Sequence, residues 1–200
     1  MQTDLEKYHT QAEPEPAADE QPRSGAGRFL FDLLETLVLS ALLFIGINAI
    51  SARIRVDGSS MEPTLHSGEF VIVNKLAYDF GSPDHGDVVV FHFPRDPDQE
   101  YIKRVIGLSG DQIRIEDGNL YVNGNLWEED YIAASPAYRG DWSVPQGQLF
   151  VLGDNRNNSS DSHNWGSVPM ENVIGKAFFV YWPPTDWGVI ITPDVAIAAP

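Results

Sequence analysis

One long apolar run near the N-terminus, residues 29–50, constrains this fold more than any other feature. It reads FLFDLLETLVLSALLFIGINAI, and as an α-helix it would be roughly 33 Å long, about the thickness of a bilayer's hydrocarbon core. Asp32 and Glu35 lie near its N-terminal end, where headgroups and the helix dipole tolerate negative charge. We therefore predict a transmembrane anchor over residues 29–51. An interfacial amphipathic helix and a buried core helix are the alternatives.

The segments flanking this run carry little information on its orientation. Residues 1–28 are polar and show no apolar period, so we predict a disordered tail. The run begins too far from Met1 for a cleaved signal peptide. Arginines stand on both sides of it, so the positive-inside rule does not orient the helix.

After residue 51 the sequence changes to short apolar stretches separated by Gly, Pro, Asn and Asp. A hairpin is predicted at 112–122, turning at Asp117-Gly118. No helical pattern of useful length follows residue 51, so we predict a mostly β, antiparallel domain. Apolar alternation or continuous apolar residues predict the other strands, at 53–56, 70–73, 88–93, 148–152 and 173–182.

The predicted domain organisation follows from these patterns. The β-rich domain covers residues 52–185, with a smaller inserted lobe at about 111–145. Residues 186–200 are predicted to be a C-terminal tail.

The composition argues against several classes of function. The formal net charge of −16 comes from 29 acidic and 13 basic residues, and nucleic-acid binding needs clustered Lys and Arg. The absence of cysteine excludes a thiol nucleophile, a disulfide and a thiolate metal site. The histidines show no metal-ligand spacing. We therefore expect no metal, no cofactor and no nucleic-acid partner.

A serine in a tight turn follows the first predicted strand. Gly58 permits backbone angles that other residues avoid, and Pro63 stiffens the far side of the turn. Such a turn can aim backbone N–H groups at a developing oxyanion. A Gly-Ser-Ser turn is more often an ordinary turn, and its residues do not distinguish Ser59 from Ser60 as a nucleophile.

A lysine lies inside an apolar strand pattern. Lys103 follows Tyr101 and Ile102 and precedes Val105 and Ile106, a setting in which lysine is rarely buried without reason. Because burial lowers the pKa of an amine, a buried lysine can accept a proton from a serine. A lysine that snorkels or forms a salt bridge is the alternative.

A dense polar run, residues 153–166, follows the strand predicted at 148–152. It carries Asp154, Arg156 and Asp161 in close order, with Trp165 to cover them. We interpret it as a packed network that orients catalytic groups; a polar surface loop is the alternative. A Ser-His-Asp triad stays open, but no histidine is placed beside the candidate serines.

Four short motifs follow the apolar run in order, and with it they span about residues 30 to 182. The chain thereby resembles the type I signal peptidases, membrane-bound serine proteases that remove signal peptides from exported proteins. The motifs are Gly58-Ser59-Ser60-Met61-Glu62-Pro63-Thr64-Leu65, Gly86-Asp87-Val88-Val89-Val90-Phe91, Tyr101-Ile102-Lys103-Arg104-Val105-Ile106-Gly107-Leu108-Ser109-Gly110-Asp111, and Gly153-Asp154-Asn155-Arg156 through Ser159-Ser160-Asp161-Ser162 to Trp165-Gly166.

The resemblance implies a role for each candidate residue. Ser60 would be the nucleophile, and its backbone N–H would hold the oxyanion. Lys103 would be the general base, and Ser159 would hydrogen-bond and orient that lysine. Asp161 would fix the local network, with Asp154 and Arg156 as structural supports.

Two positions depart from the family pattern. Some members carry a serine two residues before the nucleophile, where this chain has Gly58. Many members carry an arginine two residues after the aspartate, where this chain has His163. An Asp161–His163 pair is expected to respond to pH more strongly than an aspartate–arginine pair.

The resemblance also implies partners and a location. The substrates would be signal peptides of exported preproteins, cut after a small residue in an Ala-x-Ala pattern, and the anchor would contact membrane lipid. The enzyme would cross the plasma membrane once, with a cytoplasmic N-terminus and an extracytoplasmic catalytic domain. A membrane-tethered β-domain that binds peptides without catalysis and a self-cleaving repressor-type protease are the alternatives.

Overall fold

The computed structural model describes residues 25–193. Most of the tail predicted for residues 1–28 lies outside the described residues, as does the end of the tail predicted for 186–200.

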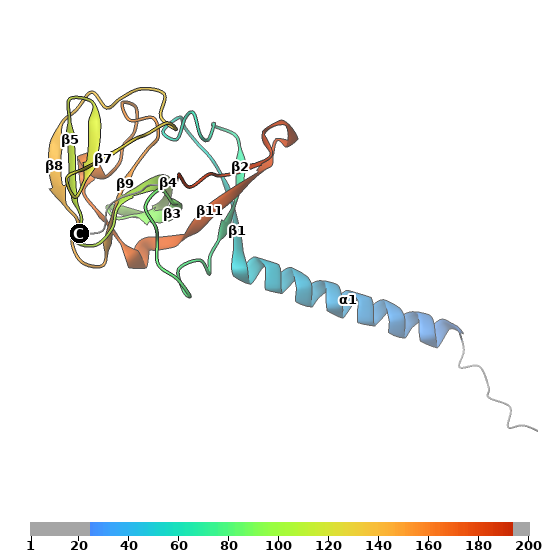
Figure 1. Cartoon of the computed structure of the whole chain (residues 1–200). Coiled ribbons are helices and arrows are strands. Elements are labelled where there is room, and N and C mark those ends of the chain that lie inside the picture. Colours follow the sequence, from blue (N-terminus) through green and yellow to red (C-terminus); the bar gives the residue numbers. More distant parts are fainter. Residues whose placement is uncertain (1–24, 194–200) are drawn as a thin grey trace, which may run out of the picture. The chain divides into compact units, whose positions relative to one another are not determined.

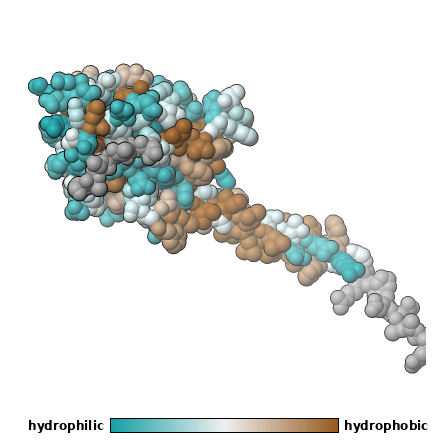
Figure 2. Space-filling model, in the orientation of Figure 1, coloured by the Kyte–Doolittle hydropathy of each residue, from teal (hydrophilic) through white to brown (hydrophobic). Residues whose placement is uncertain are grey.

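A single long helix, α1 (Gly25–Ile50), begins the described chain. It starts earlier than the predicted Phe29, and none of its side chains is buried. Figure 2 shows apolar side chains along most of its length. Two of its last carbonyl groups accept hydrogen bonds from outside the helix: Ser51 Oγ donates to the Ile47 carbonyl at 2.8 Å, and the Lys75 N–H donates to the Ile50 carbonyl at 3.0 Å. Its length and composition suffice to cross a membrane.

Antiparallel strands are the main regular structure in the rest of the described chain (Figure 1), which confirms the predicted fold class. Three short helices interrupt the strands: α2 (Ser162–Trp165), η1 (Met170–Asn172) and η2 (Pro184–Asp186). The strands are β1 (Ser51–Arg55), β2 (Phe70–Asn74), β3 (Val88–Phe93), β4 (Asp96–Gly107), β5 (Gln112–Glu116), β6 (Asn119–Val122), β7 (Asn125–Trp127), β8 (Gly140–Ser143), β9 (Gln148–Leu152), β10 (Val168–Pro169), β11 (Val173–Trp182) and β12 (Gly188–Val189).

The strands form two sheets. The larger has the order β1-β2-β11-β3-β4-β9-β10, with β12 paired to β11, and the smaller has the order β7-β6-β5-β8. The smaller sheet extends from Gln112 to Ser143, within the range where an inserted lobe is predicted. Strand β12 lies inside the predicted 186–200 tail, and its pairing to β11 ties that segment to the larger sheet.

Strand β4 is an inner strand of the larger sheet and contains Lys103. It pairs with β3 on one edge and with β9 on the other. Both of its faces are covered, because Ile102 packs into one apolar cluster and Val105 into another. A strand buried on both faces reads as a continuous apolar run, and a charged side chain within it is therefore conspicuous.

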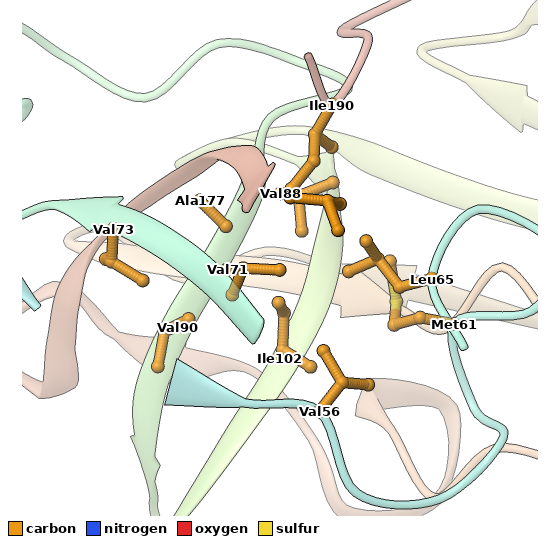
Figure 3. Packing of buried hydrophobic residues seen from close by; sticks show 11 residues of the cluster. Val56, Met61, Leu65, Val71, Val73, Val88, Val90, Ile102, Ala177 and Ile190 are labelled. Carbon is orange, nitrogen blue, oxygen red and sulfur yellow. The ribbon is translucent and has the colours of Figure 1, made fainter. Parts of the chain in front are cut away.

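Two residues of the Gly-Ser-Ser turn anchor that turn in the core. Met61 and Leu65 are buried in the cluster that holds Val56, Val71 and Ile102 (Figure 3). Burying one such side chain contributes about 1.5–3 kcal/mol. The turn is thus held by its own apolar residues, and the serine preceding Met61 takes its position from them.

Candidate active site

The Ser60 side chain belongs to the turn that connects β1 to β2. Backbone hydrogen bonds from Glu62 to the Ser59 carbonyl and from Leu65 to the Met61 carbonyl close this turn, at 3.2 and 2.9 Å. Ser60 itself is half-buried, directly before the buried Met61. The turn therefore fixes the Ser60 backbone and leaves its hydroxyl accessible.

Two asparagines of the polar run hold the same turn from the other side. The Asn155 N–H donates to the Ser60 carbonyl, and Asn155 Nδ2 donates to the Ser59 carbonyl, both at 3.0 Å. Asn158 Nδ2 donates to Ser59 Oγ at 3.0 Å. The two serines thus differ in geometry, since the Ser59 hydroxyl is held by an amide and the Ser60 hydroxyl faces Lys103.

Strand β4 supplies Lys103, which pairs with Val89 in β3. Its side chain is 4% exposed. Lys103 Nζ lies 2.8 Å from Ser60 Oγ and donates to the Ile102 carbonyl at 2.9 Å. Burial lowers the Lys103 pKa to about 8, although Asp161 and Asp154 favour the charged form. A lysine with this pKa is partly neutral near neutral pH, and a neutral amine beside a hydroxyl can accept its proton.

A cleft of about 560 Å³ opens over this pair. Its walls come from β1, from the Gly-Ser-Ser turn, from β4 and from the polar run. Both apolar and charged side chains line it, so an extended peptide would find apolar surface and hydrogen-bonding groups. The lining residues are Arg53, Ile54, Arg55, Asp57, Gly58, Ser59, Ser60, Val90, Glu100, Tyr101, Ile102, Lys103, Asn158 and Ser160.

Asp154 pairs with the arginine next to Lys103. Arg104 Nε and Nη2 donate to its two carboxylate oxygens at 2.8 and 2.7 Å, and Thr64 Oγ1 donates to it at 2.5 Å. Both charged side chains are almost fully buried, at 1% and 0% exposed. The contact joins β4, the residues after β9 and the Ser60 turn, so Asp154 is a structural link between all three.

Arg156 pairs with an acidic residue between β7 and β8, two strands of the smaller sheet. Its Nη1 donates to Glu129 Oε2 at 2.6 Å, and its Nε donates to the Gly153 carbonyl at 3.1 Å. The Tyr131 hydroxyl donates to Glu129 Oε1 at 2.7 Å. This buried network ties the polar run to the segment after β7.

Arg104 and Glu129 are not among the predicted site residues, yet both take part in the network around the site. Arg104 could have been identified by the same signal as Lys103, a charge inside an apolar strand. Glu129 lies in the acidic run Glu128-Glu129-Asp130, which offers no signal that one member is buried.

Asp161 lies at the end of the polar run with its side chain fully buried. Its Oδ2 accepts from the Gly153 N–H at 3.0 Å, and its Oδ1 lies 2.5 Å from His163 Nδ1. A Cβ added at Gly153 would collide with the Ser60 carbonyl and Ser159 Oγ. The absence of a side chain at Gly153 therefore lets the polar run approach the nucleophile turn.

The resemblance implies a hydrogen bond between Ser159 and Lys103, and the structure does not contain this bond. The Ser159 Oγ is buried and has no hydrogen-bond partner among the described residues. Lys103 Nζ instead donates to the Ile102 carbonyl. The hydroxyl lies beside Gly153 and is not hydrogen-bonded to Lys103 in this structure.

Neither a histidine triad nor a metal centre is found in the described residues. Within residues 25–193 the Ser60 hydroxyl is hydrogen-bonded to Lys103, and no histidine takes part. The same residues contain no group of three His, Cys, Asp or Glu side chains that could hold a metal ion.

The sequence of this chain is similar to those of known proteins. The family model for signal peptidase, peptidase S26, matches residues 30–182. A probable signal peptidase I-2 from Synechocystis is 47% identical over 76% of this chain and 73% of its own length. A signal peptidase I from Leptolyngbya laminosa is 38% identical over 96% and 98%. A chloroplastic thylakoidal processing peptidase 1 from Arabidopsis thaliana is 36% identical over 90% and 58%. The chain therefore belongs to the signal peptidase family, peptidase S26.

Proposed function

We propose that this chain removes signal peptides from preproteins, with Ser60 as the nucleophile and Lys103 as the general base. Membership of the signal peptidase family makes the protein a serine endopeptidase. The observation that carries the residue assignment is the 2.8 Å distance between Ser60 Oγ and Lys103 Nζ. The lowered Lys103 pKa, about 8, supports the same assignment.

The proposed reaction has two stages. Neutral Lys103 takes the proton of Ser60 as Oγ attacks the scissile carbonyl, and the Ser60 backbone N–H binds the oxyanion. The Lys103 ammonium then protonates the leaving amine. A water molecule deprotonated by Lys103 hydrolyses the acyl-enzyme and restores the free hydroxyl.

The surrounding residues take supporting roles in this proposal. Asp154 holds the Ser60 turn through Thr64, and Arg156 holds the Gly153 carbonyl. Asp161 holds the Gly153 N–H. Ser159 orients Lys103 once substrate binds, since its hydroxyl is buried and has no hydrogen-bond partner among the described residues.

The cleft supports recognition of an extended segment with small side chains, as in an Ala-x-Ala pattern. Ile54, Val90 and Ile102 supply its apolar wall. Shallow apolar pockets admit alanine and reject larger residues by steric conflict. Main-chain hydrogen bonds to strand edges would supply affinity independent of sequence.

The membrane location of the proposal rests on α1 and on an exposed aromatic turn. The helix is long and apolar enough to span a bilayer once. Trp182 and Trp187, at the end of β11 and before β12, are 53% and 63% exposed, and tryptophan favours membrane interfaces. We place the N-terminus in the cytoplasm and the catalytic domain outside it, in the plasma membrane. The thylakoidal relative makes a thylakoid membrane the second candidate.

The decisive experiment is cleavage of a synthetic precursor bearing an Ala-x-Ala site by purified full-length protein in detergent. Ser60→Ala and Lys103→Ala are assayed beside the parent. Ser59→Ala is the matched control, because its hydroxyl bonds Asn158 rather than the lysine. We expect the parent and Ser59→Ala to cut after the final alanine, and the other two to lose at least about a thousandfold in rate.

Two outcomes would contradict the proposal. Activity retained in Ser60→Ala would reject Ser60 as the nucleophile and make Ser59 the next candidate. A parent that binds the precursor but does not cut it, under conditions in which a related peptidase does, would favour the peptide-binding alternative.

A further inference from the structure

Two carboxylates act on Lys103, and their counter-charges differ in kind. Asp161 and Asp154 both favour the charged form of the lysine. Asp154 is neutralised by Arg104, whose guanidinium stays protonated at any working pH. Asp161 faces a histidine, His163, at 2.5 Å. Imidazole gains or loses its charge between about pH 5 and 8, so one carboxylate has a fixed counter-charge and the other a titratable one.

Two neighbours hold the His163 ring, one at its edge and one against a face. Its Nδ1 contacts Asp161 Oδ1, and its backbone N–H donates to the same oxygen at 3.3 Å. Tyr138, from the segment between β7 and β8, stacks on the ring with centroids 3.9 Å apart and an interplanar angle of 10°. The side chain of His163 is only 15% exposed. The imidazole is therefore fixed in place by the segment that connects strands of the smaller sheet.

Among residues 25–193, the charged groups that act on Tyr138, which stacks on the His163 ring, include Asp161, Arg156 and Glu129. Asp161 and Arg156 come from the polar run, and Arg156 is paired with Glu129 of the β7–β8 segment. From the β7–β8 segment Tyr138 faces the ring, and its hydroxyl pKa is raised above its usual range by burial and then by Asp161. Lys103 lies beyond Asp161, from β4. Because Arg156 is already paired with Glu129, His163 is the group left to balance Asp161.

We propose that His163 is a positioning residue that carries the titratable counter-charge of Asp161 and through it sets the protonation of the lysine base. This inference rests on the proposed function of Ser60 and Lys103. A charged His163 offsets the negative charge that Asp161 presents to the lysine, which favours the neutral amine. An uncharged His163 leaves Asp161 unbalanced, which favours the ammonium. The histidine thereby extends lysine-base activity toward lower pH.

The test compares two replacements that fix the charge of this position. His163→Arg is permanently charged, and His163→Gln is neutral but can still donate to Asp161. We would measure kcat and KM against pH for the full-length protein in detergent, on the synthetic Ala-x-Ala precursor. We expect the acid limb of kcat to lie about one pH unit higher in His163→Gln than in His163→Arg, with the parent between them or equal to one of them. At pH 6.5 the kcat of His163→Gln should therefore be about tenfold lower than that of His163→Arg, with the same KM.

His85→Gln is the matched control. It removes a second histidine–aspartate pair, to Asp111 at 2.7 Å, that takes no part in the network around Lys103. We expect its acid limb to coincide with that of the parent. Thermal unfolding of each variant confirms folding, and His163→Phe, which keeps an aromatic ring against Tyr138, replaces His163→Gln if that variant does not fold.

The outcomes separate this inference from the proposed function. Coincident acid limbs for the charged and neutral variants, in an enzyme that Ser60→Ala inactivates, would overturn the role of His163 and leave the serine–lysine pair standing. An equal shift in His85→Gln would also overturn it, because the effect would then be general. Loss of cleavage in the parent itself would instead reject the proposed function.

Discussion

Two adjacent cations on β4, Lys103 and Arg104, show how one strand can bury a charge in two opposite ways. Both are nearly inaccessible, at 4% and 1% exposed. Arg104 makes a two-pronged ion pair with Asp154 and donates to the Gly86 carbonyl at 2.8 Å. Lys103 hydrogen-bonds a hydroxyl and a carbonyl, with no ion pair to a carboxylate among the described residues. The arginine is buried against a carboxylate, whereas burial without direct contact to one lowers the pKa of the lysine.

Strand alternation produces this difference. Lys103 pairs with Val89, and Arg104 pairs with Val88 in β3 and with Leu152 in β9. Asp154 follows β9 by two residues, so the β4–β9 register brings it to the arginine side. One strand thus holds a structural cation and a chemical base on opposite faces, and exchanging their properties should break either function or stability.

The largest expected effect comes from giving the lysine position the chemistry of its neighbour. Lys103→Arg keeps a positive charge but cannot be deprotonated at working pH. We expect cleavage of the Ala-x-Ala precursor to fall by at least about a thousandfold. A chemical-quench time course on the folded variant measures it. Activity within tenfold of the parent would show that Lys103 is not the base.

The converse change removes the structural cation. Arg104→Met leaves the Asp154 carboxylate buried without its partner, and we expect a loss of about 3–5 kcal/mol in the free energy of unfolding. Urea denaturation followed by tryptophan fluorescence measures this loss. A double variant with Asp154→Leu should recover part of it, since both charges are then gone. A loss below about 1 kcal/mol in Arg104→Met would mean that the pair is not a structural link.

Lys103→Met should raise the free energy of unfolding, whereas Arg104→Met should lower it. The Lys103 pKa is about 8 in the folded protein, against about 10.4 for an unperturbed lysine. The unfolded chain therefore binds more protons between these values, and the burial cost is full below pH 8 and disappears as pH rises toward 10.5. We expect Lys103→Met to be more stable than the parent by about 3 kcal/mol at pH 7, and the advantage to vanish near pH 10.5.

Urea titrations of both proteins at pH 7, 9 and 10.5 provide the measurement. Arg104→Met serves as the control, because its loss should not depend on pH across this range. A Lys103→Met variant that is less stable than the parent at pH 7 would show that the lysine is stabilised by contacts rather than penalised by burial.

The contrast between Lys103 and Arg104 also shows which features of the site could be predicted from the sequence. The strand pattern identified the buried lysine, and the predicted antiparallel β fold is confirmed. The polar run predicted a packed network containing Asp154, Arg156 and Asp161, without identifying their ionic partners. In the structure their ionic partners are Arg104, Glu129 and His163.

The reason for this limit is physical. Only the His163 partner lies close in sequence, and the other two are brought in by the β4–β9 register and by the segment after β7. Local spacing predicts which residues share a loop, whereas the choice of ionic partner depends on strand pairing that joins distant parts of the chain. The turn at Asp117-Gly118 was predictable because a single local conformation, with a positive φ of 50° at Asp117, determines it.

The smallest expected change in stability tests the one supporting residue that stands outside this network. Ser159 Oγ is buried without a partner among the described residues, so Ser159→Ala removes an unsatisfied hydroxyl and should change the free energy of unfolding by less than about 1 kcal/mol. If Ser159 orients Lys103 only when substrate is bound, kcat should still fall about tenfold or more while stability stays constant. Urea denaturation and steady-state cleavage measure the two quantities on one preparation. A large loss of stability would show that the hydroxyl is hydrogen-bonded in the resting protein. Unchanged kcat would remove Ser159 from the site. Burial and the neighbouring carboxylates alone would then determine the charges of Lys103 and Arg104 on the two faces of β4.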